Sequence, residues 1–579
     1  MKRLPLGIAL ATGALLLAGC GQDPQTDDAA ANPLLRYVPD DTPFVMANLE
    51  PVPASVVDAY LERMGPVLGQ FETALAGFRD DLESGDAEIG DPRAAAVAEA
   101  VLAEFDGKLN RQGMESLGLS LEQVSAVYGH GLFPIMRIGL GDPDLVRAMI
   151  DRVQARSGVA IPEFEHQGQS YWKAADLENP MALFIAIIDD HVAFAAAPKV
   201  REQTFLPVFL GQELPARSIA ADGALGELNE DKGFAPYGSG YVDLTRVVEE
   251  MFAADSQTAA WMADMGDFDP ASIDPACERE ARLVTTFVPR IVAGTTEVTS
   301  DAVGMRYQVE TNSILGRQLA RLTDDVPPAS SDPARMASFS MNLQMGRVAQ
   351  FLRDSANAMA VVPFRCPQLQ DVNASVQQLA DRMNQPMPPF IGNLKGMRAE
   401  LSDIDPANPS PDQLRGRLSL EMESPQMVIG MASMMIPGFE NLNIEPGGEP
   451  VEVPQELLTI STPEFEVYAV MGKKAIGISV GKGEMEGLKD FIDDGGDAND
   501  VFLSLEYDAG AVARMQREGA AVFQEDAPAA TYETTSAQAP GALDVEALAA
   551  DYEALLGRTR FEFRFDGAGL TVDNRQTFD

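Results

Sequence analysis

The chain has 579 residues, of which 46% are hydrophobic, and its 88 acidic and 43 basic residues give a formal net charge of −45. It is long enough to bury large cores in more than one domain. We expect no nucleic-acid binding, because no basic stripe is present to neutralise phosphates. The acidic residues are dispersed, which favours a strongly solvated surface over a site for a basic ligand.

The first 19 residues predict a secretion signal. Lys2 and Arg3 precede an uncharged apolar run from Leu4 to Ala18, which is shorter than the roughly 20 apolar residues that span a bilayer. The following Gly19-Cys20 completes a motif that resembles a bacterial lipobox, Leu-Ala-Gly-Cys. In such signals the cysteine receives diacylglycerol and the chain is cut in front of it. The resemblance therefore implies a lipoprotein signal peptide over residues 1–19 and lipidation of Cys20.

The predicted lipid makes a membrane the first expected partner. Gly21 stands where enteric bacteria place an Asp to retain lipoproteins in the inner membrane, so the resemblance implies the outer membrane, facing the periplasm. Anionic lipid should repel the acidic body, which leaves the acyl chains on Cys20 as the main membrane contact. Residues 20–32 are small and polar, and we expect them to form a flexible tether.

Alternating apolar patterns predict strands twice along the chain, in the same order. In the first half we expect strands at 43–49, 135–140, 183–188, 192–197 and 241–244, and one at 305–310 within the closing stretch 297–311. In the second half we expect them at 338–343, 418–422, 465–470, 475–480 and 506–509, and within the closing stretch 562–576, which matches 297–311. The repeated order predicts two homologous repeats, residues 33–325 and 326–579.

Helical patterns separate these strands. An apolar seam from Val57 to Phe78 predicts a long helix, with a kink expected at Gly65-Pro66, and an Ala-rich helix is expected at 92–109. Pro143 and Pro425 follow an Asp and a Ser, which is typical chemistry for the start of a helix. Short turns join antiparallel neighbours. The predicted fold class is α+β, with a largely antiparallel sheet in each repeat and long helices packed on it.

Three segments carry a family resemblance: Arg36–Pro43, Tyr128–Pro134 and Tyr241–Leu244. They resemble uncharacterised proteobacterial envelope lipoproteins and, more loosely, a wider bacterial family of unknown function whose first strand begins with a leucine-Pro-x-Asp-Thr motif. The resemblance covers most of the chain. The family has no assigned activity, so the resemblance implies no catalytic residue.

No motif predicts a catalytic, cofactor-binding or metal-binding residue. The histidines His130, His166 and His191 are far from one another and from the cysteines, so zinc-ligand spacing is absent. His191 falls in a predicted turn and His130 lies between glycines, which favours solvent positions over ligand or general-base roles. The sequence also lacks a Gly-x-Ser-x-Gly elbow, a phosphate-binding Gly-Lys-Ser/Thr loop and a dinucleotide-binding glycine motif.

Two acidic clusters and a methionine set have plain explanations. Asp403–Asp405 and Asp493–Asp500 do not fit the calcium-loop pattern, so we expect solvated loops. The methionines of the second half are expected to fill the core, ahead of lining an adaptable apolar groove for a lipid or peptide and well ahead of binding copper(I). They are Met341, Met345, Met359, Met427, Met431, Met434 and Met435.

With Cys20 lipidated, Cys277 and Cys366 are the remaining thiols. In an oxidising compartment they predict a disulfide, which would join the two predicted repeats. The alternative is two separately buried cysteines that act as small hydrophobic side chains.

Three functions follow from the sequence, in this order of preference. The first is a non-catalytic envelope lipoprotein that binds or scaffolds an envelope protein. The second is a carrier of an apolar ligand. The third is a hydrolase of envelope material that uses paired carboxylates, which leave little trace in a sequence.

Overall fold

The computed structural model describes residues 31–84, 92–174, 180–253, 255–266, 272–323, 335–386, 388–402, 415–458, 466–493, 501–514, 550–551 and 553–579. The predicted signal peptide, Cys20 and most of the predicted tether lie outside these residues. Contacts within the chain define two compact units. Unit 1 holds the described residues of 31–273, 290–306 and 550–551, and unit 2 holds those of 274–289, 307–514 and 553–579.

The described strands form one antiparallel sheet of 19 strands, which is not closed. The first strands along the chain are β1 (Phe44–Ala47), β2 (Ser125–His130), β3 (Phe133–Gly139), β4 (Glu163–His166), β5 (Gln169–Ala174), β6 (Met181–Ile188), β7 (His191–Pro198), β8 (Ser239–Asp243), β9 (Arg290–Val298) and β10 (Ala302–Glu310). The remaining strands are β11 (Ala337–Met341), β12 (Leu394–Leu401), β13 (Gly416–Met422), β14 (Val451–Glu452), β15 (Val467–Met471), β16 (Ala475–Val480), β17 (Val501–Asp508), β18 (Leu556–Asp566) and β19 (Gly569–Phe578).

This sheet corrects the predicted fold class. The prediction of two repeats, each with its own sheet, is wrong. Strand β10 pairs with both β9 and β19, so the strands belong to one sheet. Apolar alternation locates a strand and its buried face, but it does not say which strand ends a sheet.

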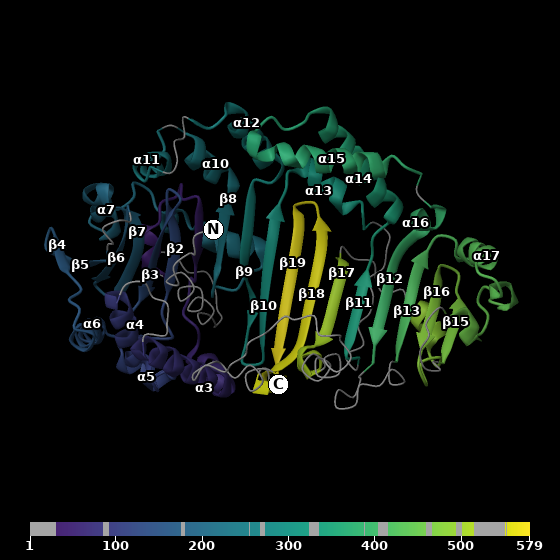
Figure 1. Cartoon of the computed structure of the whole chain (residues 1–579), viewed down its shortest axis with the longest axis horizontal. Helices are drawn as coiled ribbons and strands as arrows, with labels where there is room; N and C mark the ends of the chain where they lie inside the picture. The colour runs from purple at the N-terminus through teal and green to yellow at the C-terminus, as the bar shows by residue number, and fades with distance from the viewer. Residues whose placement is uncertain are drawn as a thin grey trace. The chain divides into compact units, whose positions relative to one another are not determined.

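In unit 2 the neighbouring strands run β10, β19, β18, β17, β11, β12, β13, β16, β15, β14 (Figure 1). In unit 1 the order is β4, β5, β6, β7, β3, β2, β1, β8, β9, β10. The pairs for which the residue register is known are all antiparallel.

Helices flank the strands in both units. They are α3 (Ala54–Ser84), α4 (Pro92–Phe105), α5 (Arg111–Ser116), α6 (Pro143–Ser157), α7 (Glu202–Phe209), α8 (Ile219–Asp222), α9 (Ala224–Lys232), α10 (Leu244–Phe252), α11 (Gln257–Asp264), α12 (Pro275–Phe287), α13 (Ser313–Ala320), α14 (Met345–Val361), α15 (Gln370–Met383), α16 (Pro389–Asn393), α17 (Pro425–Met435) and α18 (Leu488–Asp493). Short 3-10 turns are η3 (Pro33–Tyr37), η4 (Lys199–Arg201), η6 (Pro367–Leu369), η8 (Phe439–Asn441) and η9 (Gln455–Leu457).

Local sequence chemistry sets several of these boundaries. Before α6, the Asp142 carboxylate accepts hydrogen bonds from the backbone N–H groups of Asp144 and Leu145, and Gly158 ends the helix at φ 66°. Helix α3 covers the predicted apolar seam and continues through Pro66. The helix predicted at 92–109 ends earlier, at Phe105.

Unit 1 has apolar cores on both faces of its sheet. Phe184 and Ala186 of β6 belong to a large cluster that includes Phe205, Phe209 and Trp261 from α7 and α11. Ile185, which lies between them, and Ile187 point to the other face and pack in a cluster with Val146 of α6. Helices therefore cover this part of the sheet on both sides.

Candidate functional site

Unit 2 contains a sheet face made almost wholly of apolar side chains. Paired residues of neighbouring strands share a face, and Phe339 of β11 pairs with Ala399 of β12 and with Leu505 of β17. Following the register onto the neighbouring strands gives a set that we call the apolar face: Ala337, Phe339, Met341, Met397, Ala399, Leu401, Leu418, Leu420, Ile476, Ile478, Val480, Leu503, Leu505, Tyr507, Phe561, Phe563, Phe565, Leu570 and Val572. Its polar positions, Thr559, Asn574 and Gln576, lie on β18 and β19.

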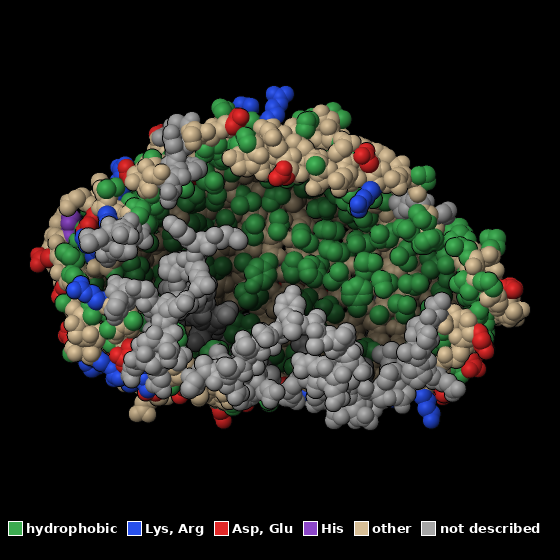
Figure 2. All heavy atoms as spheres, viewed as in Figure 1, with side chains coloured by type: hydrophobic (Ala, Val, Ile, Leu, Met, Phe, Trp, Pro, Cys, Tyr) green, Lys and Arg blue, Asp and Glu red, His purple; other side chains and the backbone are tan. Residues whose placement is uncertain are grey.

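The apolar face is only half-buried. Each of its apolar side chains except the buried Ile476 keeps an intermediate exposure. Figure 2 shows hydrophobic side chains spread over this part of the sheet, where Figure 1 places β18, β17, β11, β12 and β13, with the surface turned toward the viewer. Helix α18 packs on the opposite face, since a Cβ added at Gly477 of β16 would lie 2.6 Å from Ile492.

The opposite face of the same strands carries ions. We call it the ion-pair face, and its charged members include Arg398, Glu400, Arg417, Glu421, Glu506, Arg558, Arg560, Glu562, Arg564 and Asp573. The joined atoms lie 3.1 Å apart in Arg398–Glu421, 2.7 Å in Arg558–Glu506 and 2.6 Å in Arg564–Glu562. Buried charges are tolerated when they are paired in this way.

Glu484, in the turn after β16, closes this network. Its carboxylate lies 2.9 Å from Arg335 and 3.0 Å from Arg417. Burial alone would raise the pKa of Glu484, but hydrogen bonds from Arg335 and Ser402 and the charges of the two arginines outweigh it and lower that pKa. The carboxylate is thus held in its charged form.

Aromatic side chains concentrate at one side of the apolar face. A register shift between Val501 and Leu503 of β17 brings Phe502 onto Phe565 of β18, with ring centroids 4.1 Å apart. The Phe563 ring lies 6.1 Å from Phe502. Phe561 of β18 lies on the same face and adds a further ring to this group.

At its other side the apolar face is covered. Ala469 and Met471 of β15 pair with Ile478 and Ile476, so they continue the face, yet both are buried. Ile429 of α17 and Phe439 of η8 pack against them. The segment α17–η8 therefore forms the border of the apolar face on this side.

The histidines are not where the sequence predicts them. His191 is the first residue of β7, and its pairing with Gly139 turns the ring into the core, where Nε2 lies 3.0 Å from Arg137. Burial, and then the charge of Arg137, lower the pKa of His191 to about 4. His130 packs on Phe205 and Trp261, and burial lowers its pKa to about 4 as well. The expected solvent positions are wrong because both residues belong to strands rather than turns.

Arg137 is fully buried in the same cluster. It donates to the Tyr128 hydroxyl at 3.1 Å and to the carbonyl of Phe209 at 2.9 Å, and its guanidinium lies 4.0 Å from the centre of the Tyr37 ring. These partners account for its donors without a ligand. We therefore assign Arg137 and His191 a structural role.

The structure bonds Cys277 to Cys366, as the sequence predicts. Both cysteines lie in unit 2, where the bond ties α12 to the start of η6, so it is a bond within one compact unit. The predicted acidic loops fall outside the described residues, apart from Asp493. Within the described part of the chain, no group of three or more His, Cys, Asp or Glu residues is placed to hold a metal.

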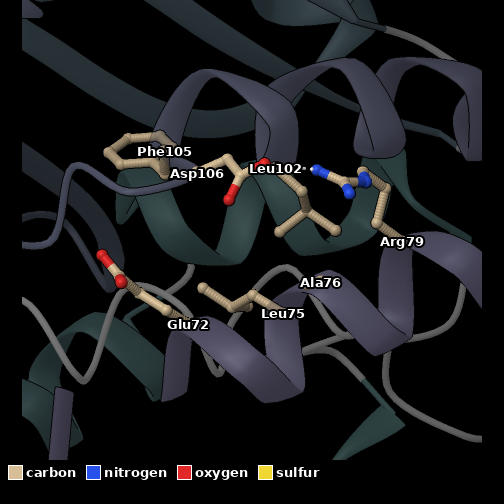
Figure 3. A pocket seen from close by; sticks show the side chains of 7 residues that line it. All are labelled: Glu72, Leu75, Ala76, Arg79, Leu102, Phe105 and Asp106. Atoms are coloured by element: carbon tan, nitrogen blue, oxygen red, sulfur yellow. Dashed lines mark hydrogen bonds and ion pairs between the residues drawn. The ribbon is translucent and has the colours of Figure 1, made fainter. Parts of the chain in front are cut away.

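A small cavity lies between α3 and α4 (Figure 3). It is lined by Glu72, Leu75, Ala76, Arg79, Leu102, Phe105 and Asp106. Its volume of about 10 Å³ is the space of roughly one water molecule. The ion pair between Arg79 and Asp106, at 2.8 Å, crosses one side of it. This cavity is a packing gap rather than a substrate site.

The methionines separate into two groups. Met341, Met345 and Met431 are half-buried, and Met341 lies on the apolar face. Core filling is wrong for the four exposed methionines, which are Met359, Met427, Met434 and Met435. The apolar face as a whole is not among the features predicted from the sequence. Its signal is present in Phe561-Glu562-Phe563-Arg564-Phe565, where large apolar residues alternate with charges.

Among the described helices, none combines the length and the apolar character needed to cross a membrane. Comparison with protein-family models, with curated proteins and with solved structures gave no match. The chemistry of the apolar face is therefore the basis for a functional assignment.

Proposed function

We propose that this chain is a lipid-anchored, non-catalytic protein of the bacterial envelope that binds a hydrocarbon chain on the apolar face of unit 2. The observation that carries the proposal is the register of the sheet, which gathers half-buried apolar side chains on one face and ion pairs on the other. In an ordinary domain the apolar face of a sheet packs against helices or a second sheet. A large apolar surface that stays accessible is typical of a binding site.

Hydrocarbon is the ligand class that fits this face best. The side chains that line it are mainly aliphatic and phenyl groups, which offer dispersion contacts and few hydrogen bonds. Its register positions hold no Asp, Glu or His, and the carboxylates of the same strands pair with arginines on the opposite face. This composition favours binding over the hydrolase that paired carboxylates would give.

The test of ligand binding uses purified protein and two variants. Lipid extracted from the wild type and identified by mass spectrometry is expected, together with saturable binding of a fluorescent fatty acid. Leu505→Glu places a charge between Phe339 and Phe561 and should abolish that binding. Leu283→Glu on α12 changes an exposed leucine elsewhere in unit 2 and should leave binding unchanged. Equal binding by all three proteins would contradict the proposal.

Ala399→Trp tests the same face without adding a charge. Ala399 lies between Phe339 and Leu418, so an indole there occupies space that the ligand needs. We expect weaker fatty-acid binding with unchanged circular dichroism. This variant keeps the test valid if Leu505→Glu does not fold.

The anchor is tested separately. Mature wild type should begin at Cys20 and carry the mass of a diacylglyceryl thioether and an N-acyl chain, while Cys20→Ser should leave an uncleaved or mislocalised precursor. An intact mass without lipid would contradict the anchor and leave ligand binding by the apolar face unaffected.

A further inference from the structure

Helix α17 and the residues after it form an uncharged segment that borders the apolar face and ends in exposed apolar residues. From Pro425 to Phe439 the sequence has no Asp, Glu, Lys or Arg, although 23% of the whole chain is charged. Pro425 is the only buried residue of the helix. The consecutive residues Met434, Met435, Ile436 and Pro437 are all exposed.

The outer side of α17 lacks the charged side chains that a surface helix normally exposes to water. Surface helices of globular proteins carry polar residues opposite their buried stripe, and a helix that is apolar all round is normally buried in protein or lipid. Methionine side chains are flexible and adapt to irregular apolar surroundings. The surface of α17 therefore suits hydrocarbon as its environment.

The inner side of this segment meets the apolar face. Ile429 and Phe439 pack with Ala469 and Met471, which continue the apolar face onto β15. Figure 1 shows α17 beside β15 and β16. An apolar path thus leads from the exposed methionines to the half-buried strands.

We propose that α17 inserts into the surface of a neutral lipid bilayer and gives hydrocarbon chains access to the apolar face, an inference that rests on the proposed function. The helix has 11 residues and a length of about 16 Å, so it lies in the interface rather than across the membrane. The exposed Glu423 and Glu440 flank it and would be repelled by anionic headgroups. A second copy of the chain is a poorer occupant, because each copy brings a net charge of −45.

The experiment is flotation with phosphatidylcholine vesicles. It uses the mature chain with Cys20→Ser, so that neither the signal peptide nor a lipid on residue 20 contributes. The parent should float with the vesicles, and M434E/M435E should reduce the floating fraction about tenfold or more. V361E/V362E at the end of α14 replaces an equally exposed apolar pair and should float as the parent does.

A second measurement follows α17 directly. A polarity-sensitive fluorophore on Met435→Cys should shift to shorter wavelength when neutral vesicles are added, and less when the vesicles contain phosphatidylglycerol. Flotation of M434E/M435E at the parent level, loss of flotation in V361E/V362E, or a dimer formed through α17 without vesicles would each overturn the inference.

The same samples separate this inference from the proposed function. A parent chain that binds fatty acid in solution but does not float contradicts membrane insertion alone. A parent chain that floats but binds no fatty acid contradicts the proposed function.

Discussion

In unit 1 the sheet carries apolar side chains on both faces and helices cover them, whereas in unit 2 one face carries ion pairs and the other stays half-exposed. Along β6 of unit 1, Phe184 and Ile185 enter two different cores. Along β18 of unit 2, Phe563 and Arg564 point to an open apolar face and to a salt-bridge network. The first arrangement builds a stable body. The second leaves apolar area free, which is what a binding surface for hydrocarbon requires.

The unfolding of each unit can be followed separately, because the two tryptophans of the chain, Trp172 and Trp261, both belong to unit 1. Tryptophan fluorescence therefore follows the unfolding of unit 1. Far-UV circular dichroism follows both units, and a transition that fluorescence does not detect belongs to unit 2.

The largest effect is expected from removing the disulfide of unit 2. Cys277 and Cys366 are 89 residues apart, and the chain-entropy model gives a contribution of about 4–5 kcal/mol for a loop of this size. C277S/C366S should lower the urea midpoint of unit 2 in circular dichroism and leave the tryptophan transition unchanged. An equal shift in both signals would mean that the two units do not unfold separately.

The next largest effect is the difference between the two units in the stability lost when an apolar side chain is truncated. Phe205→Ala removes a buried ring that lies 5.3 Å from the ring of Phe209 and 5.5 Å from that of Trp261, and we expect a loss of about 3–5 kcal/mol in the free energy of unfolding. Leu505→Ala on the half-exposed apolar face should cost about 1 kcal/mol or less. Urea unfolding of both variants gives the comparison, and similar costs would show that the apolar face is a packed core.

Several strands of unit 2 could be located from the sequence, but partners far apart in the chain could not. Apolar alternation predicts strands near β11, β13, β15 and β16, because the period of two is a local property. The pairing of β10 with β19 depends on contacts between residues far apart in the chain, which a local pattern does not encode.

The apolar face was not predicted from the sequence for a related reason. In Phe561-Glu562-Phe563-Arg564-Phe565 the alternation is plain, and it normally means that the apolar side is buried and the charged side faces water. Here the charged residues form a paired network and the apolar residues stay half-exposed. Whether a helix covers the apolar face is a tertiary property, so the sequence could not reveal that this face stays half-exposed.

Removing one partner of an ion pair on the ion-pair face should lower the free energy of unfolding somewhat less than truncating the core of unit 1 does. Arg398 is buried and donates to Glu421 at 3.1 Å and to the carbonyl of Phe491 at 2.7 Å. Arg398→Met leaves the carboxylate of Glu421 without this partner, and we expect a loss of about 3 kcal/mol in the stability of unit 2. R398M/E421M should recover part of the loss, as measured by urea unfolding in circular dichroism. A double variant less stable than the single one would show that the ion pair itself is not the source of the effect.

The smallest expected effect is the response of unit 1 to mild acid. Burial lowers the pKa values of His130 and His191 to about 4, below the ordinary value of 6.5, so between these pH values the unfolded chain binds protons that the folded chain does not. The stability that these neutral rings preserve is complete above pH 6.5 and is lost as the pH falls toward 4.

At pH 5 the loss should be on the order of 1–2 kcal/mol for each histidine. Urea midpoints from tryptophan fluorescence at pH 7 and pH 5 measure it, and H130Q/H191Q should show a smaller difference between the two pH values. Unit 2 should respond only at lower pH, because Glu484, whose pKa is lowered, remains charged until the pH falls below the ordinary range of a glutamate. A fluorescence midpoint that does not change from pH 7 to pH 5 would mean that the two rings are protonated in the folded unit, contrary to their burial.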